Sequence, residues 1–387
     1  MLTCVTIERP TPNPADTTSI NLAAGTTIVP SMTLGAALNV TGTGRLVVTG
    51  PVTLQADLTI NASADLVFEG AVTANTGNYT LTKTGLGTLT LAGSDANSFG
   101  GSDVTGGTLL LAKGGAVALP ANLRVDGPAT VRLLRPNQLA AGSTVMLNGA
   151  IGNAVLDLNG QPQTIGALGN TIGGAVELGG ATLTLDNSAG SSFSGQIQGL
   201  GMLVKQGSGT LTLAASALQG CGLSVAGGQV VVSGTTASRV ASLDLKGGTL
   251  NLGDSTLLID YGSGRDPIDR IRSYIVGDVA PLTGASLPLG YGDSADGLVS
   301  GLPANTVVVK PTLAGDANLD GKVDFVDLLV VAQHYNGTQA AWTRGDFNGD
   351  GIVNFADLLV MAQNYGKAKL TGAVKTTGAA SRRRPLR

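Results

Sequence analysis

Two twelve-residue stretches near the C-terminal end share one spacing of oxygen-bearing residues. Positions 1, 3, 5, 9 and 12 are Asp or Asn, position 6 is Gly, and position 7 offers a backbone carbonyl. In the first stretch the candidate ligands are Asp316, Asn318, Asp320, Lys322, Asp324 and Asp327. In the second stretch they are Asp346, Asn348, Asp350, Ile352, Asn354 and Asp357. A hard cation such as Ca²⁺ binds about six to eight oxygens, so the spacing predicts two calcium ions, one for each loop.

The two predicted loops differ in charge. The first contains four carboxylates and the second contains three. More ligand charge favours tighter binding, so we predict that the first loop has the higher calcium affinity. A module this small buries little apolar surface, and we expect metal binding to be coupled to its folding. The alternative is a pair of Asp-, Asn- and Gly-rich turns without metal.

An apolar helix is predicted directly behind each loop, with side chains at positions i, i+3, i+4 and i+7. These are Phe325, Leu328, Leu329 and Ala332 in the first unit, and Phe355, Leu358, Leu359 and Ala362 in the second. No helix is expected before the first loop, because Pro311 to Gly315 leads straight into it. A duplicated loop with an exiting helix resembles a type I dockerin, and the resemblance covers residues 313–368.

The dockerin resemblance implies a cohesin-like or other surface protein as the partner. It also implies an association with polysaccharide-degrading assemblies. In dockerins of that kind the residues that contact the partner are usually hydroxyl and basic residues. Here the equivalent positions are apolar, Phe325-Val326 and Phe355-Ala356. Three uses remain open for them: docking to a partner, packing the two helices together, or packing on the end of the preceding domain.

The rest of the chain has the composition of an all-β protein with many tight corners. Of 387 residues 58 are Gly, 13% are charged and 3% are aromatic. Alternating Thr and Leu occur in two similar blocks, Lys83 to Ala92 and Lys205 to Ala214. Each is followed by a Gly-Gly pair and a short strand, where Gly permits a positive φ. Such strands bury their Leu face only by stacking, which predicts a parallel β-helix or β-solenoid. An array of β-sandwiches is the alternative.

The repeats resemble the autotransporter-associated β-strand repeat of bacterial surface proteins. Three stretches carry the resemblance: Leu156 to Leu168, Phe193 to Gly199 and the Lys205 block. Combined with the dockerin-like end, the layout is similar to that of planctomycete-type surface proteins. We therefore expect a mainly β chain in four parts: a solenoid at 1–255, a β-rich cap or connector at 256–312, an α-helical dockerin domain at 313–368 and a disordered basic tail at 369–387.

Charge and motifs narrow the function. A formal net charge of −3 argues against nucleic acid as a partner. No apolar run reaches the length of a membrane-spanning segment. No signal peptide is visible, so either the chain is not secreted or its N-terminus is incomplete or mis-started, and we favour the second interpretation.

Neither Cys4 nor Cys221 lies in a metal-like motif, and we expect both to be unpaired. The single histidine, His334, is expected on a helix surface.

The preferred function is a non-catalytic spacer or adhesin, extracellular or on the cell surface. The alternative is a polysaccharide-degrading β-helix enzyme, a glycoside hydrolase or lyase, targeted by the dockerin. Acids in the predicted solenoid are scattered singly, as at Asp157, Glu177, Asp186 and Asp244. Three or more acids converging with a Lys or Arg would favour the enzyme.

Overall fold

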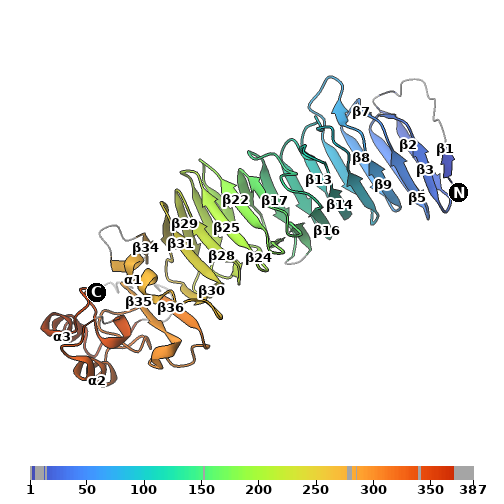
Figure 1. Ribbon diagram of the computed structural model, residues 1–387. Helices are drawn as coiled ribbons and strands as arrows, with labels where there is room; N and C mark the ends of the chain where they lie inside the picture. Colours follow the sequence, from blue (N-terminus) through green and yellow to red (C-terminus); the bar gives the residue numbers. More distant parts are fainter. Residues whose placement is uncertain are drawn as a thin grey trace, which may run out of the picture.

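The computed structural model describes residues 2–4, 13, 15–150, 153–276, 281–284, 286–338 and 341–369. Figure 1 shows a long stack of short strands that ends in a small helical part at the C-terminal end. Most of the predicted basic tail, residues 370–387, lies outside the described residues, as does the side chain of Cys4. Among the described residues no helix is long and apolar enough to cross a membrane.

The stack is a β-solenoid with three faces. One sheet of 15 strands runs along its whole length. Its strands, in spatial order, are β1 Leu2–Cys4, β3 Thr26–Val29, β6 Arg45–Val48, β9 Asp65–Phe68, β12 Thr88–Leu91, β14 Gly107–Leu111, β16 Ala129–Leu133, β18 Ala154–Asp157, β21 Ala175–Glu177, β24 Gln196–Gln198, β27 Leu218–Gln219, β30 Ala237–Val240, β33 Thr256–Asp260, β36 Thr306–Pro311 and β35 Leu289–Asp293.

The second face is made of two sheets that follow one another. The first holds β2 Thr17–Leu22, β5 Ala37–Gly42, β8 Leu58–Ala62, β11 Leu81–Thr84, β13 Ser102–Val104, β15 Leu123–Asp126, β17 Thr144–Asn148 and β20 Ala167–Gly169. The second holds β23 Ser191–Phe193, β26 Thr210–Ala214, β29 Gln229–Ser233, β32 Thr249–Asn251 and β34 Leu282–Thr283.

The third face is likewise made of two sheets. Near the N-terminal end it holds β4 Met32–Leu34, β7 Val52–Leu54 and β10 Val72–Ala74. Farther along it holds β19 Gln163–Ile165, β22 Thr182–Asp186, β25 Met202–Gln206, β28 Gly222–Val225 and β31 Ser242–Leu245. Pairing is parallel from coil to coil, as where β12 pairs with β14 and β14 with β16.

Alternation of Thr and Leu builds the core as predicted. In β12 and β26 every Leu is buried and every Thr is only partly buried. Leu89, Leu91, Leu211 and Leu213 are fully enclosed. Because each coil stacks its Leu side chains on those of the next, the apolar column is continuous. The β-solenoid is confirmed, and the array of β-sandwiches is wrong.

The Gly-Gly pairs serve two different steric needs. Gly107 and Gly228 have φ of +64° and +62°, as expected for tight corners. Gly248 has no positive φ. A Cβ at Gly248 would instead lie 2.6 Å from Cγ1 of Val225, so close packing between coils requires Gly there.

The first residue of each repeat block is a buried lysine, a feature that the sequence analysis missed. Lys83 Nζ donates to the carbonyls of Thr84 at 2.7 Å, Gly85 at 2.9 Å and Gly106 at 3.1 Å. Lys205 Nζ donates in the same way to Gln206 and, at 2.9 Å, to Gly207. These bonds tie the glycine corner of one coil to the next. Burial lowers the pKa of Lys83 to about 8.

The solenoid ends in an antiparallel layer followed by helix α1. β33 is parallel to β30, but β36 is antiparallel to β33, and β35 is antiparallel to β36. Helix α1 spans Ile268–Val276 and the 3₁₀ turn η1 spans Ser294–Asp296. The predicted domain limits at 255, 312 and 368 stay predictions.

The helical end contains α2 Phe325–His334, the 3₁₀ turn η2 Trp342–Arg344 and α3 Phe355–Ala362. It lies directly on β35. A Cβ added at Gly290 of β35 would lie 2.5 Å from Cδ2 of Leu319 and 2.9 Å from Nε1 of Trp342. Glycine at this position therefore allows the first predicted calcium loop and η2 to approach the strand.

Candidate metal centre

The first loop folds around the carboxylate of Asp316, which is fully buried. Its Oδ1 accepts from the amide of Asp320 at 3.0 Å, and its Oδ2 accepts from that of Gly321 at 2.9 Å. Gly321 has φ +89°, the sharp turn expected at position 6. Asn318 Oδ1 also accepts from the amide of Asp320, at 3.0 Å. The amide of Lys322, at position 7, donates to Asp320 Oδ1 at 2.9 Å.

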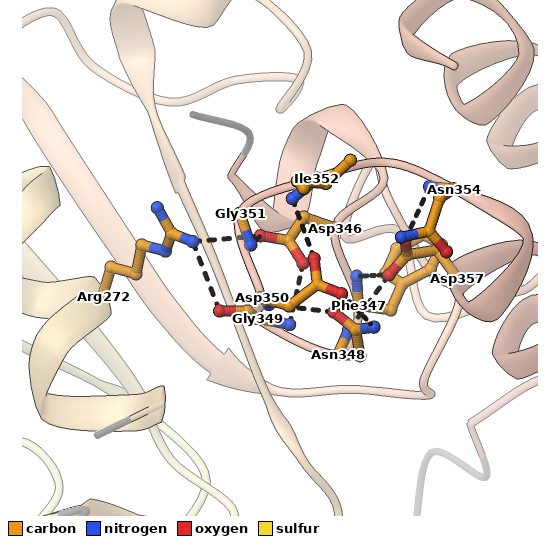
Figure 2. A network of polar contacts seen from close by, with 10 residues as sticks. All are labelled: Arg272, Asp346, Phe347, Asn348, Gly349, Asp350, Gly351, Ile352, Asn354 and Asp357. Carbon is orange, nitrogen blue, oxygen red and sulfur yellow. Dashed lines mark hydrogen bonds and ion pairs between the residues drawn. The ribbon is translucent and has the colours of Figure 1, made fainter. Parts of the chain in front are cut away.

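The second loop repeats this arrangement (Figure 2). Asp346, only 1% exposed, accepts from the amides of Gly349 at 2.8 Å and Gly351 at 3.0 Å. Asp350 Oδ1 accepts from the amide of Ile352 at 2.8 Å. Asn348 Oδ1 accepts from the amide of Asp350 at 2.9 Å. The sequence similarity between the loops thus extends to their backbone geometry.

Position 9 caps the helix that leaves each loop. Asp324 Oδ1 accepts from the amide of Val326 at 2.8 Å, and Asn354 Oδ1 accepts from that of Ala356 at 2.7 Å. Both N-caps form a capping box with the Asp at position 12. Position 9, predicted as a ligand, therefore serves as the helix N-cap in both units. Its Oδ1 accepts a backbone N–H of the helix.

Position 12 is buried at the centre of each loop. Asp327 Oδ1 accepts from the amide of Ala317 at 2.8 Å, and its Oδ2 accepts from that of Asp324 at 2.9 Å. Asp357 makes the equivalent bonds to Phe347 and Asn354. Position 12 therefore joins the start of each loop to the start of its helix.

The electrostatics of the first loop favour a cation. Burial raises the pKa of Asp316, hydrogen bonds from Thr312 and Gly321 lower it, and the neighbouring carboxylates of Asp327 and Asp320 raise it, with a net rise. Burial likewise raises the pKa of Asp327. Within the described residues neither of these two carboxylates forms an ion pair. Buried carboxylates without a counter-ion are costly, so a bound cation fits this environment.

The acids alone do not form a metal cage. Among the described residues no group of three or more His, Cys, Asp and Glu side chains is placed to hold a metal ion. The predicted donor set is wider, because it includes the amide oxygens of Asn318 and Asn348 and the carbonyls of Lys322 and Ile352. All predicted ligands in each loop lie on one continuous, hydrogen-bonded turn, and their oxygen chemistry fits Ca²⁺.

The two loops differ in what contacts position 1 from outside. In the first loop the hydroxyl of Thr312 donates to Asp316 Oδ2. In the second loop the guanidinium of Arg272, from α1, lies 3.2 Å from Asp346 Oδ2. Arg272 also donates to the carbonyl of Gly349 at 3.2 Å. Burial raises the pKa of Asp346, while hydrogen bonds from Gly351 and Gly349 and the charge of Arg272 lower it.

The apolar side chains that begin each helix are exposed. Phe325 and Phe355 are both 66% exposed, and Leu329 and Leu359 are 46% and 49% exposed. The inward face consists instead of Val330 and Val331 in α2 and of Met361 in α3, beside the position-12 acids. Packing of the two Phe side chains between the helices, or on the solenoid end, is therefore wrong. Their exposure repeats from one unit to the next.

Comparison with known proteins assigns the C-terminal segment. Residues 314–365 match the dockerin type I domain. The two loops and their exiting helices form a dockerin domain. Residues 81–111 and 203–232 match the passenger-associated-transport repeat, in agreement with the predicted autotransporter-associated repeats.

A 163-residue stretch, 40% of the chain, is 36% identical to the adhesin BmaC autotransporter of Brucella suis biovar 1 (strain 1330). The match spans only 4% of that protein's length. No solved structure matches the chain.

The solenoid acids are less scattered than predicted. On the long sheet Arg132 pairs with Asp157 in register, Asp157 with Glu177, and Glu177 with Gln198. Arg132 Nε lies 3.3 Å from Asp157 Oδ2. This row contains two acids, fewer than the three that would favour an enzyme.

Proposed function

We propose that this protein is a non-catalytic surface or extracellular β-solenoid, a spacer or adhesin, that attaches to a partner through a calcium-dependent dockerin domain. The repeat match and the similarity to part of an adhesin support the role of the solenoid. The attachment by calcium is supported above all by the duplicated loop. In both copies the carboxylates at positions 1 and 12 are buried, and the loop leads into a helix with a capping box.

We assign two calcium ions to the dockerin domain, one in each loop. Side-chain oxygens at positions 1, 3, 5 and 12 and the carbonyl at position 7 would hold each ion, with position 9 behind them as the helix cap. Bound Ca²⁺ would compensate the buried negative charge. The loop would then hold its exiting helix in place, so calcium controls the surface that the helices present.

The partner-binding surface, in this proposal, is the docking surface formed by Phe325, Val326, Leu329, Phe355 and Leu359, all of them exposed. Exposed aromatic side chains are typical anchors of protein interfaces. The dockerin match supports a cohesin-type partner. Because this surface is apolar, the partner should present apolar recesses rather than the polar groups that a hydroxyl-rich dockerin would require. Such a pairing would place the solenoid on a larger assembly, including one that degrades polysaccharide.

Binding of the full chain to purified type I cohesin modules, measured by biolayer interferometry in Ca²⁺ and in EGTA, tests the proposal. We expect binding to at least one module in Ca²⁺ and its loss in EGTA. Circular dichroism should show helix gained on addition of Ca²⁺ but not of equimolar Na⁺. A full chain that takes up no Ca²⁺ by calorimetry, or that binds a cohesin module equally well in EGTA, would overturn the attachment mechanism.

A further inference from the structure

Helix α1 inserts a positive charge beside the second calcium loop (Figure 2). Arg272 Nη2 lies 3.2 Å from Asp346 Oδ2 and 3.2 Å from the carbonyl of Gly349. The Asp346 side chain is fully buried, and the Arg272 side chain is 27% exposed. A cation of the chain itself therefore already contacts the position-1 ligand of the second site.

Among the residues that the structure describes, no cationic side chain makes a matching contact with the first loop. Its position-1 carboxylate, Asp316, accepts from the neutral hydroxyl of Thr312. The nearby Lys310 donates to the carbonyl of Leu319 at 2.6 Å instead. The amide that donates to Oδ1 of the position-1 carboxylate also differs, since it is that of Asp320 in the first loop and that of Gly349 in the second. The remaining hydrogen bonds of the two loops correspond, so Arg272 is the difference in charge between two similar sites.

The guanidinium also borders a second group of carboxylates. A cavity of about 330 Å³ between α1, β35 and η2 is lined by Arg272 together with Asp266, Asp269, Asp293 and Asp296. Asp296 is paired with Arg344 at 2.9 Å. Asp293 is only 3% exposed, and within the described residues its Oδ2 has no hydrogen-bond partner.

We propose that Arg272 lowers the calcium affinity of the second loop and couples the loading of that loop to the position of α1. This inference rests on the proposed calcium sites. An incoming Ca²⁺ and the guanidinium compete for Asp346 because both carry positive charge. On loading, Arg272 turns from Asp346 toward the acidic cavity, where the unpaired carboxylate oxygen of Asp293 can accept it. Calcium binding at the second loop would thus change the position of α1 at the end of the solenoid.

The test isolates the second site in the full chain with Asp320→Ala, which removes an exposed first-loop ligand. In that background we compare Arg272, Arg272→Gln and Arg272→Lys by calorimetric titration with Ca²⁺. Arg270→Gln, an exposed change of equal charge on the same helix, is the matched control. We expect Arg272→Gln to tighten binding about tenfold, the effect of one neighbouring charge. Arg272→Lys should restore weak binding, and Arg270→Gln should have little effect.

Two further measurements distinguish an electrostatic effect of Arg272 from a structural one. The difference between Arg272 and Arg272→Gln should shrink in 1 M salt, because a partly exposed charge is screened. Hydrogen exchange in α1 should change when Ca²⁺ fills the second site, and this change should disappear in Arg272→Gln.

Two outcomes would overturn the coupling. Equal affinity in Arg272 and Arg272→Gln would show that the charge has no effect on the site. Weaker binding in Arg272→Gln would show that Arg272 braces the loop for calcium instead of competing with it. If the unsubstituted chain binds no Ca²⁺ at either loop, the proposed calcium sites fail first, so the two failures are distinguishable.

Discussion

The indole Nε1 of Trp342 donates a hydrogen bond of 2.7 Å to the backbone carbonyl of Asp316. Trp342 precedes the second loop and is 5% exposed, and Asp316 is position 1 of the first loop. The Trp342 ring also contacts Phe347 edge-on, with centroids 5.3 Å apart. The segment that leads into the second loop therefore supports the first, so the two loops share one core.

Replacing Trp342 with Phe should weaken this support. The ring contact is largely kept, but the carbonyl of Asp316 loses its donor, which costs about 1–3 kcal/mol when the group is buried. We expect a lower free energy of unfolding of the dockerin domain and weaker Ca²⁺ binding at the first loop, measured by calorimetry in an Asp350→Ala background. Unchanged first-loop affinity would contradict the role of the hydrogen bond.

The first loop should bind calcium more tightly than the second. The second loop has Arg272 next to position 1. The additional carboxylate of the first loop, Asp324, serves as the helix cap, but it still adds negative charge close to the proposed ion. Calorimetry of Asp320→Ala, which leaves the second loop intact, should therefore show weaker binding than that of Asp350→Ala, which leaves the first. The order is disproved if Asp320→Ala retains the tighter site.

Contact between β35 and the dockerin domain depends on Gly290. Its added Cβ would lie 2.5 Å from Leu319 and 2.7 Å from Thr312, so Gly290→Ala must displace the first loop or β35. We expect a loss of about 1–3 kcal/mol in the unfolding of this region and faster proteolysis between β36 and α2. Gly142→Ala serves as the control, because no atom of the described residues lies within 4 Å of the added carbon there. Equal proteolysis of both variants would refute the tight contact.

The buried lysine at the glycine corner should make solenoid stability depend on alkaline pH. Burial lowers the pKa of Lys83 from 10.5 to about 8 in the folded chain. Between these values the unfolded chain binds the additional proton, so stability rises with pH. Relative to Lys83→Met, the free energy of unfolding of the unsubstituted chain should rise as the pH increases from about 8 to 10.5. Below pH 8 this gain should be absent. Chemical denaturation at several pH values measures the difference, and a flat difference would contradict it.

Contacts within one continuous segment could be predicted from the sequence, whereas contacts between distant segments could not. Spacing within a continuous segment sufficed for the loops and for the Leu column, because one turn or one strand places all the residues involved. The register of Lys83 and Lys205 in the two repeat blocks was a usable signal for the buried lysines. Nothing local marks Arg272 as a neighbour of Asp346, because 74 residues and a change of strand direction separate them.

The helices illustrate a second limit of the sequence. Phe325 and Leu329 fit the spacing of a buried face, yet they lie in solvent while Val330 and Val331 face inward. α2 is apolar on more than one side, so periodicity could not decide which side is buried. Asp327 determines which side of α2 is buried, because its side chain points into the loop and forms hydrogen bonds with Ala317 and Asp324.

The repeated docking surface should make single substitutions weak and the double substitution strong. Phe325 and Phe355 are equally exposed, so a partner can engage either unit. Phe325→Ser and Phe355→Ser should each reduce affinity for a cohesin module only a few-fold. The double variant should lose about 2–4 kcal/mol of binding free energy, roughly 30- to 700-fold in affinity, as expected for aromatic anchors. Interferometry in Ca²⁺ measures all three.

Leu86→Ser provides the control for that experiment, because it removes a side chain that is 87% exposed on the solenoid, far along the chain from the dockerin domain. It should leave cohesin binding unchanged, and calcium uptake should be unchanged in every variant, since Phe325 and Phe355 supply no oxygen. A double variant that binds the module as well as the unsubstituted chain would place the partner on another surface. Loss of binding from Phe325→Ser alone would show that the two units are not equivalent.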